Sequence, residues 1–168
     1  MIPLENQVCS LPLAQRLKEL RVKQESYFVW AKLAERPEKW RIQVKDRQYE
    51  DEFSAFTVAE LGGMLPQRIE QSVLDARFPW KEEDEDHNER VYDELREVLP
   101  ELWDHYDHKY EEFGYPLQRT FRDGFTVDYY FDDPDAEYNE TVFEVKGATE
   151  ADARATMLIY LLENGLIE

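Results

Sequence analysis

Residues 149–165 constrain the fold more than any other stretch, because their pattern specifies a helix too apolar to stand alone in water. The apolar residues share one helical face, at the spacing i, i+4, i+7, i+8 and i+11: Ala151, Ala155, Leu158, Ile159 and Leu162. Met157 and Leu161 widen that face. Thr149 suits the N-cap, and Gly165 suits the left-handed residue that ends a helix. We therefore expect the rest of the chain to cover most of this helix.

Aromatic and β-branched residues predict a hairpin from residues 26–32 and 39–44, with its turn at residues 35–38. The second strand alternates apolar with polar or basic residues: Trp40, Arg41, Ile42, Gln43, Val44 and Lys45. Because successive side chains of a strand point to opposite faces, this strand has one dry face and one basic face.

A second hairpin is predicted by residues 117–121 and 125–131, in which Asp123 and Gly124 form a two-residue turn. Residues 140–146 predict a further strand that leads into the C-terminal helix. Further helices are predicted at residues 11–20, 57–66, 88–99 and 100–113, whereas residues 67–77 fit either a strand or a helix.

These elements predict the α+β class. We expect an antiparallel sheet of about four to six strands, packed by the C-terminal helix, with an added pair of acidic helices. One domain is expected over residues 1–168, and the acidic helical part occupies residues 81–114. Asn88 is the expected cap of the first acidic helix, after a run of like charges that starts at Lys81.

The net charge of −18 comes entirely from the second half of the chain. Residues 1–80 hold 12 bases and 12 acids, residues 81–113 hold 4 and 14, and residues 114–168 hold 4 and 12. Such a field repels nucleic acid and attracts basic surfaces. Direct binding of DNA or RNA is therefore disfavoured, and binding to a protein that itself grips nucleic acid is favoured.

Cys9 is the single cysteine, so the chain has no internal disulfide and a reducing compartment is the simplest expectation. The sequence has no apolar run of about 20 residues and no signal-peptide pattern at its start. We expect a cytoplasmic protein.

The candidate binding surface is a set of carboxylates in the acidic part, on the outer faces of the two predicted helices and in the run before them. Its members are Glu82, Glu83, Asp84, Glu85, Asp86, Glu89, Asp93, Glu94, Glu97, Glu101, Asp104 and Asp107.

One pattern bears on catalysis. His105 and His108 are three residues apart, with Glu101 one turn earlier, which is an incomplete metal-binding face. A solvated polar face of a helix explains the pattern more simply. We therefore expect no catalytic residue, metal or cofactor, and whether these three residues bind a metal stays open.

Three segments resemble a family of small, uncharacterised proteins encoded by phages and prophages. They are residues 9–20 with 23–30, the sequence FTVAELGGMLP at residues 56–66, and TEADARATMLIYLLENGLI within residues 149–168. The resemblance implies a phage origin. It also implies that the acidic residues 81–114 are an insertion, so that a role specific to this protein lies there.

Charge and resemblance together predict a phage-derived acidic protein that is not an enzyme and inhibits a host nucleic-acid-binding defence protein of the CRISPR-effector or restriction-enzyme class. Duplex DNA carries a negative charge about every 1.7 Å along its axis, so carboxylates on rigid helices can act as a DNA mimic. The alternatives are a phage assembly or structural accessory protein, an acidic surface that serves solubility only, a homodimer, and a metal-dependent enzyme.

Overall fold

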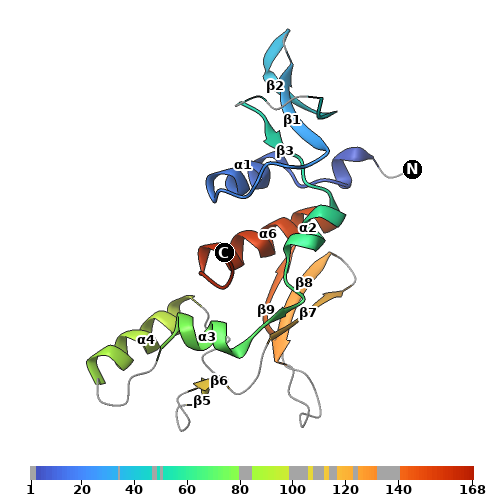
Figure 1. Cartoon of the computed structure of the whole chain (residues 1–168). Coiled ribbons are helices and arrows are strands. Elements are labelled where there is room, and N and C mark those ends of the chain that lie inside the picture. The colour runs from blue at the N-terminus through green and yellow to red at the C-terminus, as the bar shows by residue number, and fades with distance from the viewer. Residues whose placement is uncertain are drawn as a thin grey trace.

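The protein has an α+β fold, shown in Figure 1 as a computed structural model. The structure describes residues 3–33, 35–46, 49, 51–79, 85–98, 106–107, 112–113, 117–122, 125–131 and 141–168. Helix α6 (Glu150–Glu163) lies at the centre of Figure 1, with α1 (Leu11–Glu19) on one side and the largest sheet on the other. The predicted organising helix is thus confirmed.

Burial of α6 extends beyond one stripe. Ala151, Ala153, Ala155, Met157, Leu158, Ile159 and Leu161 are all buried. The Thr149 hydroxyl accepts a hydrogen bond from the Asp152 amide at 3.1 Å, and the Asp152 carboxylate accepts one from the Ser10 amide at 2.7 Å. Asp152 therefore joins the start of α6 to the residue before α1, and Gly165 ends the helix at φ 68°.

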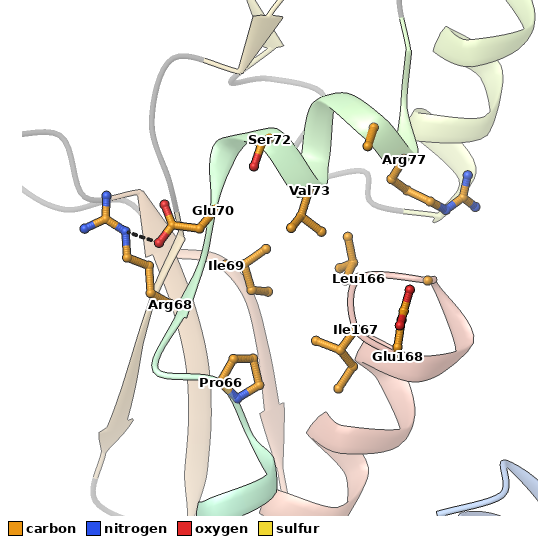
Figure 2. Close-up of a pocket in the computed structure, with 12 residues that line it drawn as sticks. Pro66, Arg68, Ile69, Glu70, Ser72, Val73, Arg77, Leu166, Ile167 and Glu168 are labelled. Carbon is orange, nitrogen blue, oxygen red and sulfur yellow. Dashed lines mark ion pairs between the residues drawn. The ribbon is translucent and has the colours of Figure 1, made fainter.

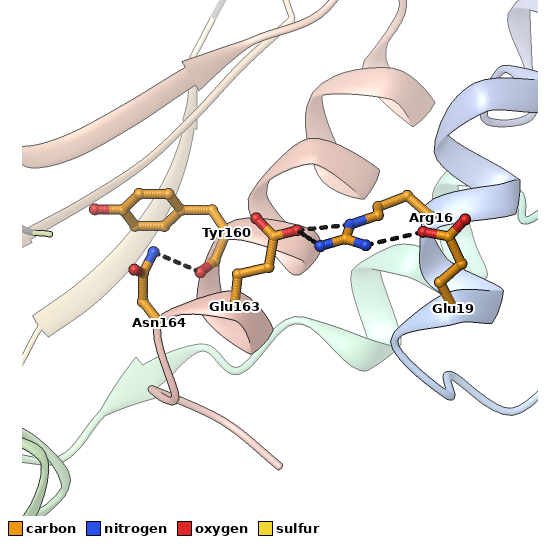
Figure 3. Close-up of polar contacts among 5 residues, drawn as sticks. All are labelled: Arg16, Glu19, Tyr160, Glu163 and Asn164. Atoms are coloured by element: carbon orange, nitrogen blue, oxygen red, sulfur yellow. Dashed lines mark hydrogen bonds and ion pairs between the residues drawn. The ribbon is translucent and has the colours of Figure 1, made fainter.

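A second contact joins α1 and α6 on the surface (Figure 3). The Arg16 guanidinium lies between Glu19 on its own helix, at 2.8 Å, and Glu163 on α6, at 2.6 Å. These carboxylates raise the pKa of Arg16. In the same view the Asn164 amide donates to the Tyr160 carbonyl at 2.8 Å and helps to end α6.

The largest sheet has four antiparallel strands in the order β4 (Arg68–Ile69), β7 (Leu117–Arg122), β8 (Thr126–Phe131) and β9 (Thr141–Lys146). It confirms the predicted second hairpin and the strand after it. Asp123 and Gly124, the predicted two-residue turn, lie outside the described residues, whereas Arg122 before them pairs with Thr126. Phe125, just before β8, adopts φ 61°.

The first hairpin forms a separate sheet, in the order β2 (Arg36–Val44), β1 (Phe28–Leu33) and β3 (Phe53–Ser54). The hairpin is confirmed, but its turn was predicted too late, since Leu33 pairs with Arg36. Pro37 lies within β2, which is tolerated because β2 is an edge strand and proline needs no ladder partner there. Val44, expected on the dry face, is 52% exposed.

Helices α2 (Val58–Met64) and α3 (Gln71–Arg77) add Leu61 and Leu74 to one hydrophobic core, which we call the shared core. The 3-10 helix η1 (Leu4–Asn6) has no buried residue. Helix α2 confirms the helix predicted within residues 57–66, and it begins with a capping box in which Thr57 and Glu60 each accept a hydrogen bond from the other's amide. The ambiguous residues 67–77 hold both a strand, β4, and a helix, α3.

The carbonyls at the end of α2 are bound by the largest sheet. Arg119 on β7 donates to the carbonyls of Gly62 and Leu65, and the Tyr129 hydroxyl on β8 donates to that of Pro66 at 2.7 Å. Burial lowers the pKa of Arg119 and raises that of Tyr129. A cation at the negative end of a helix is favourable, so these bonds fix α2 against the sheet.

The prediction of a second acidic helix at residues 100–113 is wrong for the four residues of that range that the structure describes. Tyr106–Asp107 (β5) and Glu112–Phe113 (β6) form a small antiparallel pair in which Tyr106 faces Phe113. A separation of seven residues fits two helical turns, but it also fits facing positions of a hairpin with four residues between its strands. Aromatic residues favour strands, which explains the outcome.

Candidate acidic interface

Helix α4 (Glu85–Val98) is the part of the predicted acidic region that the structure shows as a helix. Val91 and Leu95 are buried in the shared core, so one face of α4 is anchored. The helix starts inside the acidic run, three residues before the predicted cap Asn88, which is itself buried. Acidic residues at a helix N-terminus are stabilised by the helix dipole, which explains the earlier start.

The opposite face of α4 carries a row of four exposed carboxylates, which we call the acidic row. Its members are Asp86, Glu89, Asp93 and Glu97. They follow one another at three or four residues, so at a rise of 1.5 Å per residue they lie roughly 4.5 to 6 Å apart along the axis. The row occupies the face farthest from Val91 and Leu95, as the helical period requires.

Like charges within the row repel each other. Glu89 has Asp86 three residues before it and Asp93 four residues after it, and no base at either spacing. Within the part of the chain that is described, no ion pair involves any member of the row. Each like-charge pair at this spacing costs a helix roughly 0.2 to 0.5 kcal/mol. A basic partner would remove that cost on binding.

Arg77, on α3, holds α4 against the body of the protein. Its guanidinium forms an ion pair with Glu94 at 2.5 Å and donates to the Asn164 carbonyl at 2.8 Å. It also lies 4.9 Å from the centre of the Phe78 ring. The residue therefore joins α3, α4 and the end of α6. Glu94 was predicted as part of the binding surface, but its carboxylate serves this internal contact.

The start of α4 is held by a second contact. A ring nitrogen of His87 lies 2.9 Å from the Pro79 carbonyl, across the residues that precede the helix. Anchoring at both His87 and Arg77 leaves the acidic row on a fixed helix, and a fixed row loses less conformational entropy when it binds.

The remaining predicted site residues lie outside the described residues or are placed only by their backbone. Glu82, Glu83, Asp84, Glu101 and Asp104 belong to the first group, as do His105 and His108. Glu85 and Asp107 belong to the second, in α4 and β5. The structure thus brings together four of the twelve predicted carboxylates, Asp86, Glu89, Asp93 and Glu97, as one exposed face.

A pocket of about 630 Å³ was missed by the sequence analysis (Figure 2). Its apolar lining includes Ile69 and Val73 from one side and Leu166 and Ile167 from the other. No local pattern predicts it, because its two walls are almost a hundred residues apart in sequence. An ion pair between Arg68 and Glu70, at 3.2 Å, lies at its rim. The charged and hydroxyl side chains of its described lining are Arg68, Glu70, Ser72, Arg77 and Glu168.

Other chemical sites find no support in the described residues. No three of their His, Cys, Asp or Glu side chains are grouped to hold a metal ion. Cys9 is fully buried, as expected for a small core residue, and burial raises the pKa of its thiol to about 12. Among the helices with described residues, none combines the length and the apolar character that crossing a membrane requires.

Comparisons with protein-family models, curated proteins and solved structures found no match to this chain. The phage resemblance therefore stays a prediction.

Proposed function

We propose that the protein is a phage-derived, non-catalytic inhibitor that acts in the cytoplasm of a host cell. Its acidic row binds the nucleic-acid-binding surface of a host defence protein, of the CRISPR-effector or restriction-enzyme class. One observation carries the proposal: Asp86, Glu89, Asp93 and Glu97 share one exposed face of a helix whose other face is anchored in the core.

The dimensions support mimicry of a short stretch of nucleic acid. Helix α4 has 14 residues and is therefore about 21 Å long, which is about six base-pair steps at 3.4 Å. A groove that binds phosphates presents lysine and arginine along such a length and gains entropy by releasing counterions. Carboxylates about 5 Å apart offer that groove a line of negative charge, although a sparser one than a single DNA strand, whose phosphates follow one another at about 3.4 Å along the axis.

Charge-reversal variants test this proposal. Glu89→Lys, Asp93→Lys and Glu97→Lys together reverse three of the four members of the row. Glu5→Lys, Glu25→Lys and Asp51→Lys together make the same change in net charge at exposed positions outside α4. We expect immobilised wild-type protein and the control to capture the same nucleic-acid-binding protein from host extract, and the row variant to lose it.

The effects of salt and of competing duplex DNA on capture show whether the protein binds by mimicking nucleic acid. At about 0.5 M salt exposed charges are largely screened, so capture should fall, and added duplex DNA should displace the captured protein. Equal capture by the row variant, or capture that DNA does not affect, would refute binding by mimicry. If the protein forms an oligomer of defined size and captures no nuclease, the result would favour the alternative of a phage assembly protein.

A further inference from the structure

Strand β2 forms one edge of the three-stranded sheet, and its hydrogen-bonding pattern shows which backbone groups face outward. The Lys45 amide donates to the Tyr27 carbonyl at 2.9 Å, which makes residues 27 and 45 a hydrogen-bonded pair. In an antiparallel ladder such pairs alternate with non-bonded ones. The amides and carbonyls of Trp40, Ile42 and Val44 therefore point away from β1, along the edge that no described strand covers.

The side chains of β2 separate by charge along this edge. Arg41 and Gln43 lie on one face of the strand, and Lys45 continues that face just beyond the end of β2. The exposed Lys39 precedes them, in the irregular part of the pairing with β1. Trp40, Ile42 and Val44 lie on the other face, where Val44 is 52% exposed. Three of the four large hydrophobic residues that stand out as exposed in the described chain, Tyr27, Val44 and Tyr49, belong to this region.

We propose that the β2 edge binds an extended segment of a partner protein that alternates acidic with apolar residues. An added strand would satisfy the outward backbone groups, which is a common mode of peptide recognition. Its carboxylates would lie beside Lys39 and Arg41, and its apolar side chains beside Ile42 and Val44, at cross-strand distances of about 5 Å.

Charge selects this occupant over a second copy of the chain. Two β2 edges paired with each other would place their basic rows side by side, and like charges directly opposite are destabilising. The edge also lies at the opposite end of the molecule from α4 (Figure 1), so the two surfaces are separate.

A synthetic peptide tests the proposal on the full chain. The probe is a nine-residue, acetylated and amidated peptide that alternates glutamate with valine or threonine, and its control has lysine in place of glutamate. We expect the acidic peptide to bind and to shift the amide resonances of β2 in NMR spectra, while those of α4 stay unchanged.

Two variants separate backbone pairing from side-chain contact. Val44→Pro removes one outward amide and leaves the bonds between β1 and β2 intact, whereas Val44→Ala keeps the amide. We expect about tenfold weaker binding for the proline variant than for the alanine variant. The double variant Lys39→Glu and Arg41→Glu should prefer the lysine peptide.

The opposite results would overturn the proposal. No binding by a folded wild-type protein would do so, as would equal affinity for both peptides or equal binding by the proline and alanine variants. Sedimentation that shows a dimer which Val44→Pro dissociates would identify a second copy as the occupant and refute the partner strand. Binding of a single-stranded oligonucleotide at this edge, in place of the acidic peptide, would do the same.

Discussion

Glu89→Lys should stabilise the protein while it abolishes binding of the partner. Glu89 is exposed in the middle of α4 and has like charges at Asp86 and Asp93, three residues before it and four after it. Each pair costs roughly 0.2 to 0.5 kcal/mol, and a lysine turns each cost into a similar gain. The two pairs together predict an increase of about 1 kcal/mol in the free energy of unfolding at low salt.

Urea unfolding at about 20 mM salt measures this increase, with an unchanged slope as evidence that the same two states are compared. Because the effect is electrostatic, it should nearly vanish in about 1 M salt, where the Debye length is about 3 Å. An unchanged or lower stability, or a gain that persists in high salt, would refute the argument that the row is under repulsion.

Glu94→Lys is the matched control, since it makes the same charge change five residues further along the helix. It removes the 2.5 Å ion pair with Arg77, whose side chain is only 27% exposed, and places two cations together. We expect a loss of about 1 kcal/mol. Opposite signs for Glu89→Lys and Glu94→Lys would show that the row is kept for interaction and Glu94 for stability.

Three further predictions concern the shared core. Asp152→Ala removes the acceptor of the Ser10 amide at 2.7 Å and should lower the free energy of unfolding by about 1 to 3 kcal/mol, read from the urea midpoint. Cys9, with its pKa raised to about 12, should resist iodoacetamide at pH 8 until urea unfolds the protein; rapid labelling of the native protein would contradict its burial. Burial raises the pKa of Glu60. Hydrogen bonds that its carboxylate accepts from Thr57, Tyr27 and Ser26 outweigh the burial and hold this pKa below its usual value. Its stabilisation is therefore complete above about pH 4.3 and is lost as the pH falls through the folded-state pKa, a dependence that Glu60→Gln should flatten.

The elements with redundant local signals were predictable from the sequence. The C-terminal helix combined a cap at Thr149, a wide apolar face and a stop at Gly165, and every one of these appears in the structure. The capping box at Thr57 and Glu60 likewise identified α2. Where several independent signals agree, tertiary context has little to decide.

The errors fall where one periodicity fits two structures or where long-range pairing decides. Tyr106 and Phe113 suit either a helix or a hairpin, and pairing selected the strands. The acidic row was predicted as part of a larger surface because helical spacing shows which carboxylates point outward. That spacing does not show that Arg77 binds Glu94, since this contact joins α3 to α4 through their packing.

Competition between this protein and duplex DNA for a captured nuclease tests the central claim most directly. If the acidic row occupies the DNA-binding groove, the apparent affinity of the nuclease for this protein should fall as the fraction of nuclease bound to DNA rises. The slope of log affinity against log salt should also flatten in the variant that reverses Glu89, Asp93 and Glu97. Simultaneous binding of DNA and wild-type protein, or an unchanged salt slope in that variant, would contradict the claim.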